Sequence, residues 1–228
     1  MSDELRAKNQ KPGTPNSLPF RQAGELHPDQ PPLRMIAWEL TRSCNLACVH
    51  CRASAAYGPY EGELSTQEVF GVMDNIASFS KPVIILTGGE PLLRADIFDL
   101  ASYGTGKGFR MVMATNGTLF NEETVQKMKA SGIQRISISI DGPTAETHDA
   151  FRKVKGSFEG SLQGIEMAKK GGVEFHINTT ITQVNLHLIP EILRLAVRLG
   201  AVALHILLLV PTGRGKELKD QEISALDY

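Results

Sequence analysis

The sequence contains no long apolar run, no excess of charge of one sign and few cysteines. A helix that crosses a bilayer needs about 20 consecutive apolar residues, whereas the longest candidate, Val202–Val210, is short and is interrupted by His205. The 24 basic and 25 acidic residues give a net charge of -1, so no electrostatic feature favours a nucleic-acid partner. These absences argue against both a membrane and a nucleic acid as partners.

The N-terminus also lacks the positively charged and then apolar pattern of a secretory signal. Residues 1–33 are polar and rich in proline, a composition that does not bury enough apolar area to become ordered. We therefore predict a flexible leader at 1–33 and a core domain at 34–216. Residues 217–228 are predicted to start a further helix, with the rest of the chain missing.

All three cysteines, Cys44, Cys48 and Cys51, lie within eight residues of one another. A disulfide-stabilised secreted domain would carry an even number of cysteines, spread along the chain. The odd and clustered set therefore indicates a cytoplasmic protein with a metal or redox site.

From Arg34 onward, short β-branched runs alternate with amphipathic segments. The six predicted strands cover 35–40, 83–86, 109–113, 136–140, 175–181 and 202–209. One predicted helix begins at Ser65, which forms a capping box with Glu68, and another covers about 95–103. Two further helices are predicted after the caps Asn121 and Ser157, and the last covers 188–199.

Six strand–helix repeats indicate a parallel sheet, because each parallel crossover needs a helix to return the chain. Polar residues follow many successive strands, which is typical of a barrel whose strand ends surround one site. An open doubly wound sheet would concentrate them at one switch point. The predicted fold is α/β, a partial (β/α)6 TIM-like barrel that is truncated at its C-terminus.

The motif Cys44-x3-Cys48-x2-Cys51 follows the first predicted strand. Soft thiolates select zinc or iron–sulfur centres. Three thiolates on a four-iron cube leave one iron free to bind another ligand, unlike the closed clusters of electron carriers, in which four cysteines bind the four irons. A zinc site formed by the three cysteines and His50 is the alternative, although His50 adjoins Cys51 and would have difficulty sharing one tetrahedron with it.

This motif, with Gly88-Gly89-Glu90-Pro91 after the second strand, resembles the radical S-adenosylmethionine (radical SAM) superfamily over roughly 35–216. The resemblance implies a [4Fe–4S] cluster on the three cysteines, with the amino and carboxylate groups of S-adenosylmethionine on the open iron. One electron from the cluster would then cleave S-adenosylmethionine to methionine and a 5′-deoxyadenosyl radical. The protein supplies position and the exclusion of water.

The Gly-Gly-Glu-Pro turn is predicted to bind this cofactor. Gly88 and Gly89 allow a close backbone approach, Glu90 pairs with the methionine ammonium, and Pro91 fixes the turn. Further cofactor contacts are implied by the resemblance, namely ribose and methionine contacts from Ser139 and Asp141, a carboxylate contact from Arg152, and an additional candidate in Asn116.

Other polar residues on the predicted strands are less specific. Successive side chains of a strand point to opposite faces, so only alternate residues of 175–181 can face the barrel lumen. Whether Thr179 is one of them stays open. His176 and His205 lie within apolar strands and are predicted to be core histidines. Gly213-Arg214-Gly215 fits either a cradle for a carboxylate or phosphate, or a plain loop. No substrate-converting residue is identified.

Two segments, Ile36–Ser43 and Val210–Leu218, resemble SPASM-type radical SAM enzymes and, among them, the haem synthases of the sirohaem-dependent route. The resemblance implies oxidative decarboxylation of two propionates of iron-coproporphyrin to vinyl groups, which gives haem b. It also implies a tetrapyrrole substrate, an electron donor such as flavodoxin or ferredoxin, and an auxiliary iron–sulfur cluster in a missing C-terminal region.

Three alternatives remain open. A peptide-modifying maturase, or an enzyme of the haem d1 or didecarboxysirohaem deacetylase type, would share the same core and act on a different substrate. A non-catalytic iron–sulfur electron carrier would have no affinity for S-adenosylmethionine.

Overall fold

The computed structural model describes residues 32–226, so all but the last two residues of the predicted leader lie outside the described part. Six parallel strands form one sheet in the order β1-β2-β3-β4-β5-β6. Their bounds are β1 (Met35–Thr41), β2 (Val83–Gly88), β3 (Arg110–Thr115), β4 (Ile133–Ser139), β5 (Phe175–Ile181) and β6 (Leu204–Leu208).

Each strand pairs in parallel with the next strand of the chain. A doubly wound sheet reverses its strand order at a switch point, whereas this sheet never does. Within residues 32–226 it remains open, with β1 and β6 as its two edges. The predicted partial (β/α)6 barrel is therefore confirmed.

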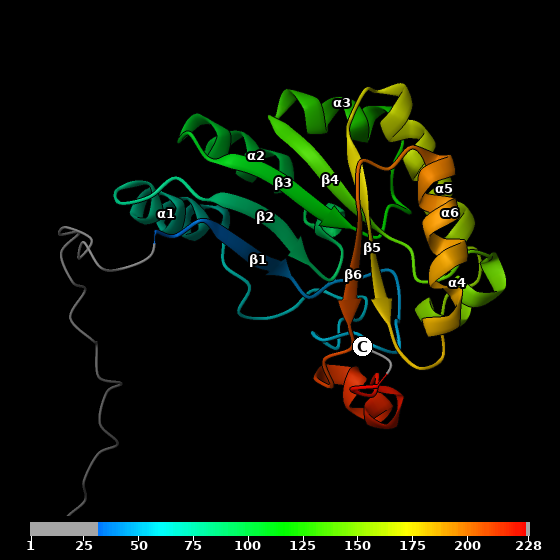
Figure 1. Cartoon of the computed structure of the whole chain (residues 1–228). Helices are drawn as coiled ribbons and strands as arrows, with labels where there is room; N and C mark the ends of the chain where they lie inside the picture. The colour runs from blue at the N-terminus through cyan, green and yellow to red at the C-terminus, as the bar shows by residue number, and fades with distance from the viewer. Residues whose placement is uncertain (1–31, 227–228) are drawn as a thin grey trace, which may run out of the picture.

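Six α-helices connect the strands: α1 (Thr66–Ala77), α2 (Ile97–Gly106), α3 (Glu122–Ala130), α4 (Ala145–Arg152), α5 (Ser157–Lys170) and α6 (Ile189–Leu199). Figure 1 shows the labelled helices along one side of the curved sheet. The blue and cyan loop after β1 and the red C-terminal segment gather where the strand arrows end. The carboxyl ends of the strands are therefore covered by two segments far apart in sequence.

The core lies between the helices and the convex face of the sheet. In the inner strands, alternate residues point into it and are fully buried, as Ile84 and Leu86 of β2 and Met111 and Met113 of β3 are. Their neighbours Ile85 and Val112 face the opposite, concave side and are only partly buried. The concave face is thus left open to form a site.

The helix caps agree with the sequence in part. Ser65 and Glu68 form the predicted capping box of α1, and Asn121 accepts the Thr124 N–H at the start of α3. Ser157 was predicted to cap α5, but the N-cap is Gly156, with a φ of 85°. The Asp149 carboxylate accepts the N–H groups of residues 156 and 158 instead. Asp149 belongs to α4, a helix that the sequence did not predict.

The C-terminal prediction also needs correction. Residues 213–221 form the 3-10 helix η3 (Gly213–Gln221), and Glu222 is extended, so up to residue 226 the predicted start of an α-helix is not found. The Gln221 carbonyl accepts the Gln183 N–H at 2.9 Å rather than an N–H of its own helix. At the other end, Leu33 packs against the core although it was predicted to belong to the leader. The domain limits themselves stay a prediction.

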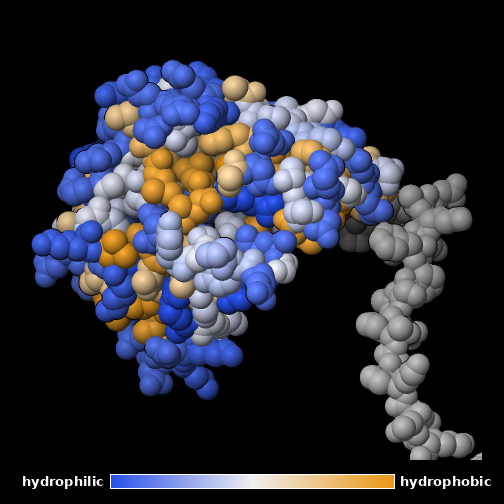
Figure 2. Space-filling view, turned by 180° about the vertical axis from the view of Figure 1, so that it is seen from behind, coloured by the Kyte–Doolittle hydropathy of each residue, from blue (hydrophilic) through white to orange (hydrophobic). Residues whose placement is uncertain are grey.

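The surface is largely polar. Figure 2 shows an apolar area near the middle of one face and smaller apolar areas elsewhere on it, among many polar residues. Among the described residues, exposed apolar side chains include three successive residues of β6, which are Ile206, Leu207 and Leu208. No helix between residues 32 and 226 is long and apolar enough to cross a membrane.

Candidate functional site

The loop between β1 and α1 carries the three cysteines to the carboxyl end of β1. Cys44 and Cys48 are buried, Cys51 is partly buried, and all three thiols are free. Each sulfur accepts one N–H group, from Leu46 to Cys44 at 3.4 Å, from Arg152 to Cys48 at 3.5 Å and from Ala55 to Cys51 at 3.3 Å. Donors directed at the sulfurs stabilise thiolates and tune iron–sulfur clusters.

The geometry favours a cluster over a single zinc ion. Within the described residues, no three His, Cys, Asp or Glu side chains are arranged to hold one metal ion. A cube does not require such convergence, because each thiolate binds a different iron. His50 does not complete a zinc site, since its Nε2 lies 3.9 Å from Asp141 and its ring packs on Phe151.

The environment of Cys44 disfavours its thiolate form, and a bound iron centre would change this preference. Burial raises the pKa of Cys44 to about 11, and the negative charges of Glu90, Cys48 and Cys51 add to this, while the Leu46 N–H opposes it. A bound cation removes this penalty, because metal coordination deprotonates a thiol. The donor set therefore fits a positively charged cluster core.

The Gly88-Gly89 turn is locked against the base of the cysteine loop. The Gly89 N–H donates to the Thr41 carbonyl at 2.7 Å, and the Glu90 N–H donates to the Ser43 carbonyl at 2.8 Å. A Cβ on Gly88 would overlap the Thr41 backbone, and one on Gly89 would overlap the Ser43 carbonyl. The glycines permit the close approach of two segments of this chain, and both also line the cavity.

Glu90 was predicted to pair with the methionine ammonium, and that contact stays a prediction. Its side chain is fully buried and accepts hydrogen bonds from the Thr115 hydroxyl and from the N–H groups of Asn116 and Leu92. Burial raises its pKa to about 7, although these donors favour the charged form. The carboxylate fixes the turn and the end of β3. It does not line the cavity, and Pro91 does not either.

Asn116 joins the cysteine loop to the end of β3. Its side-chain amide donates to Asn45 at 2.8 Å, and its carbonyl oxygen accepts the Thr118 N–H and hydroxyl. Asn45 in turn donates to the Thr118 hydroxyl. Asn116 borders the cavity, but its amide is engaged in holding the loop. Asn45 was missed from the sequence, although it lies inside the cysteine motif.

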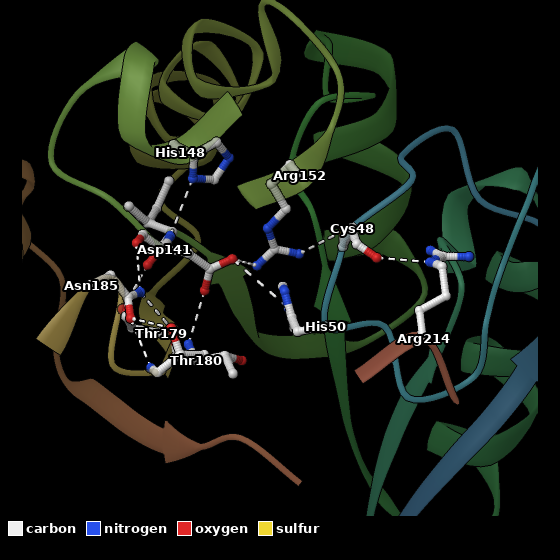
Figure 3. Close-up of polar contacts among 11 residues, drawn as sticks. Cys48, His50, Asp141, His148, Arg152, Thr179, Thr180, Asn185 and Arg214 are labelled. Atoms are coloured by element: carbon white, nitrogen blue, oxygen red, sulfur yellow. Dashed lines mark hydrogen bonds and ion pairs between the residues drawn. The ribbon is translucent and has the colours of Figure 1, made fainter. Parts of the chain in front are cut away.

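A buried ion pair lies beside Cys48, as Figure 3 shows. Arg152 from α4 pairs with Asp141 at 2.6 Å and donates to the Cys48 sulfur. Burial alone would raise the pKa of Asp141, but the charges of Arg152 and His50 hold it below its usual value. Asp141 also accepts the Thr180 N–H and does not line the cavity, whereas Arg152 does.

Arg214, after β6, holds the opposite side of Cys48 (Figure 3). Its Nε donates to the Cys48 carbonyl at 2.8 Å and its Nη1 to the Ala55 carbonyl at 2.6 Å. The Arg214 N–H donates to the Cys51 carbonyl at 3.0 Å. The segment that was predicted as either a cradle or a loop thus closes over the cysteine loop.

These elements enclose a cavity of about 610 Å³ beside the cysteines. Ser139, Asn178 and Thr180 from β4 and β5 line it, as does the apolar side of β6. Thr179 points away, since its buried hydroxyl donates to the Ile140 carbonyl. The Asn178 side-chain oxygen is buried without a hydrogen-bond partner among the described residues. An unpaired buried acceptor on a cavity wall is an expected feature of a ligand site.

An open parallel barrel, with three thiols facing a polar cavity at its carboxyl end, defines the core of a cluster-binding enzyme. The model of the radical SAM superfamily matches residues 38–196, and the chain belongs to that superfamily. Membership implies a [4Fe–4S] cluster and S-adenosylmethionine, as the sequence resemblance indicated.

Relatives with curated names are similar over most of the chain. The AdoMet-dependent heme synthase of Nitratidesulfovibrio vulgaris is 55% identical over 203 residues, which are 89% of this chain and 55% of the relative. The Fe-coproporphyrin III synthase of Methanosarcina barkeri is 39% identical over 83% of this chain and 47% of its own length. The chain thus spans about half the length of these relatives.

A solved structure shares the fold. The crystal structure of Streptococcus suis SuiB bound to S-adenosylmethionine aligns with a TM-score of 0.69 at 15% sequence identity. The alignment covers 85% of this chain and 43% of SuiB. At this identity the similarity supports the fold alone.

The contact between the two loops can be tested with Gly89→Ala. The new Cβ would overlap the Ser43 carbonyl next to Cys44, so we expect the iron content after anaerobic reconstitution to fall at least about twofold, because overpacking shifts backbones. Gly71→Ala is the matched control, since nothing lies within 4 Å of a Cβ there. Equal iron content in all three proteins would contradict the proposed locking of the loop.

The buried His148 predicts acid sensitivity. Its Nδ1 accepts the Asp141 N–H at 3.2 Å. Burial lowers its pKa from 6.5 to about 4, and the charge of Arg152 adds to this, while Asp141 and Asp149 oppose it. Below about pH 6.5 the histidine is protonated in the unfolded chain but stays neutral in the folded chain. The free energy of unfolding therefore falls as the pH drops toward 4.

In His148→Gln the side-chain oxygen can accept the same N–H without titrating. The stability lost between about pH 7 and pH 5 should shrink by about 1–2 kcal/mol relative to the unmodified chain, measured by urea unfolding at both pH values. His187→Gln, at an exposed histidine, should leave the loss unchanged. An unchanged loss in His148→Gln would show that this histidine does not cause the acid sensitivity.

Proposed function

We propose that this chain is the radical-generating core of a haem synthase that oxidatively decarboxylates propionates of iron-coproporphyrin to vinyl groups. The observation that carries the proposal is its 55% identity over 203 residues to a curated heme synthase. The site geometry is compatible with it, because the cysteine loop, the Gly-Gly turn and the cavity form one connected unit.

In this proposal, Cys44, Cys48 and Cys51 hold the cluster and leave one iron for S-adenosylmethionine. The bound cluster and cofactor supply one-electron reduction and carbon-radical chemistry. The chain contributes positioning and shielding: the Gly88-Gly89 turn borders the cofactor, and Ser139, Asn178 and Arg152 provide polar groups on the same wall. Three other residues act indirectly. Asp141 holds Arg152, Glu90 fixes the turn, and Asn116 holds the cysteine loop.

Asn178 is a further candidate for a cofactor contact, because it lines the cavity. It is paired in register with Ser139 on β4, so both side chains face the cavity side by side, and its oxygen lacks a partner within the described residues. A ribose hydroxyl or an ammonium group would supply the missing donor. We propose that Asn178 accepts such a hydrogen bond from S-adenosylmethionine.

The test of this contact is Asn178→Ala. We expect the affinity for S-adenosylmethionine to fall about 3- to 10-fold, the usual size of one lost hydrogen bond, measured by anaerobic calorimetry on the reconstituted protein. Thr179→Val is the matched control, because its side chain points away from the cavity and its loss should lower stability without changing affinity. Equal affinity in Asn178→Ala would remove Asn178 from the site.

The proposed substrate is a tetrapyrrole with propionate groups. The cavity wall changes from polar near the cysteines to apolar along β6, and such a gradient suits a planar apolar ring with charged edges. A flavodoxin or ferredoxin would donate the electron. An auxiliary cluster outside residues 1–228 and a cytoplasmic location complete the proposal.

The main experiment is anaerobic reconstitution with iron and sulfide, followed by dithionite and S-adenosylmethionine. We expect 5′-deoxyadenosine to form, and Cys48→Ser to form none, as measured by liquid chromatography. Binding of iron-coproporphyrin III, monitored by its absorbance, should accompany this activity. Its tetramethyl ester, which lacks free carboxylates, should bind at least about tenfold more weakly.

The outcomes separate the candidate functions. An electron carrier would reconstitute a cluster but form no 5′-deoxyadenosine. A peptide-modifying maturase would form 5′-deoxyadenosine without binding the tetrapyrrole. Either result would refute the haem synthase proposal.

A further inference from the structure

Two histidines lie on the open concave face, not in the core as the sequence predicted. His176 from β5 is partly buried, and His205 from β6 is exposed. Their ring centroids are 4.3 Å apart, so the two side chains share one face of the sheet. His205 is paired in register with Asn178, which lines the cavity. The pair thus extends the wall of the cofactor cavity away from the cysteines.

One member of the pair, His176, is held in its neutral form. Burial lowers the pKa of His176 to about 4, and His205 and the charge of Arg135 add to this, so the His176 ring is neutral at pH 7. A neutral imidazole nitrogen is an axial ligand for a tetrapyrrole iron. His205 is exposed and its ring lies tilted against that of His176, so it is the member of the pair that a ligand can reach.

The surroundings fit a large flat ligand with carboxylates. Leu207, two residues after His205 and in register with Thr180, continues the same wall as an apolar surface. Arg135 from β4 lies close enough to influence His176. Its Nη2 pairs with Glu174 at 2.6 Å, but its Nε is buried without a hydrogen-bond partner among the described residues. A cation and an apolar strip therefore flank the imidazole pair.

We propose that His205 is the axial ligand of the iron in a tetrapyrrole bound on the concave face of β5 and β6, with His176 holding the His205 ring in place. The inference rests on the proposed function and deepens it. His205 would hold the substrate on β6, in register with Asn178 on the neighbouring strand β5. The edge of the ring that carries the propionates can then face the cofactor cavity.

The test compares iron-coproporphyrin III with metal-free coproporphyrin III as probes of the 228-residue chain. In the unmodified chain, iron-coproporphyrin III should show the absorbance and electron paramagnetic resonance signals of an imidazole-ligated iron. His205→Ala should lose these signals and bind the iron probe about tenfold or more weakly, while its affinity for the metal-free probe stays within about twofold. Added imidazole should restore the ligated spectrum.

Further variants separate ligation from packing. His176→Ala should keep a ligated spectrum but weaken binding of the iron probe about tenfold, the usual effect of losing a residue that orients a ligand. His187→Ala, at an exposed histidine of the η2 turn (Leu186–Leu188), should change neither probe.

The inference would be overturned if His205→Ala kept the ligated spectrum, or if it weakened both probes equally. The haem synthase proposal would survive either result, because it is tested by 5′-deoxyadenosine formation and by tetrapyrrole binding in the unmodified chain. If the unmodified chain bound neither probe, the substrate assignment itself would fall, and this inference with it.

Discussion

The site depends on how the cysteine loop is held, and above all on Cys48, which two arginines contact from opposite sides. Arg152 donates to its sulfur and Arg214 to its carbonyl, and they approach from α4 and from the segment after β6. The carbonyls of Phe151 and Arg152 also accept the N–H groups of Val49 and Ala47. Because a loop without regular structure cannot satisfy its own backbone, these external partners fix the cysteine positions. Residues 44–51 are therefore held from outside the loop, by α4 and by the segment after β6.

The cations have a second consequence for the chemistry. Three thiolates add negative charge in a partly buried site, and an unpaired buried charge is costly. Arg152 offsets this cost while remaining paired with Asp141, which is itself fixed by the Thr180 N–H. The network that shapes the loop is thus the same network that makes an anionic cluster acceptable there. The Gly-Gly turn and the Asn45–Asn116 contact close the remaining side.

In the proposed function, cofactor and substrate share the open face of the barrel. The helices cover only the convex side, so the concave side keeps polar residues from β4 and β5 next to apolar residues from β6. Strand alternation separates these residues from the core. Thr179 points away from the cavity, and its neighbour Asn178 points into it. A ligand on this face can therefore meet the cysteine end and the histidine pair of β5 and β6 at once.

The sequence by itself determined the strand–helix alternation, the cysteine motif and the family, because periodicity and spacing are local properties of the chain. It also placed Cys44, Cys48, Cys51 and the Gly-Gly turn at the correct strand ends. Only the tertiary structure decided what Glu90, Asp141 and Arg152 contact, since their partners lie on other strands and loops. The same holds for Arg214, 166 residues from Cys48, and for the histidines: a short apolar strand does not reveal whether it lies in the core or at an open edge. Side-chain roles set by long-range packing were therefore the part that sequence patterns could not supply.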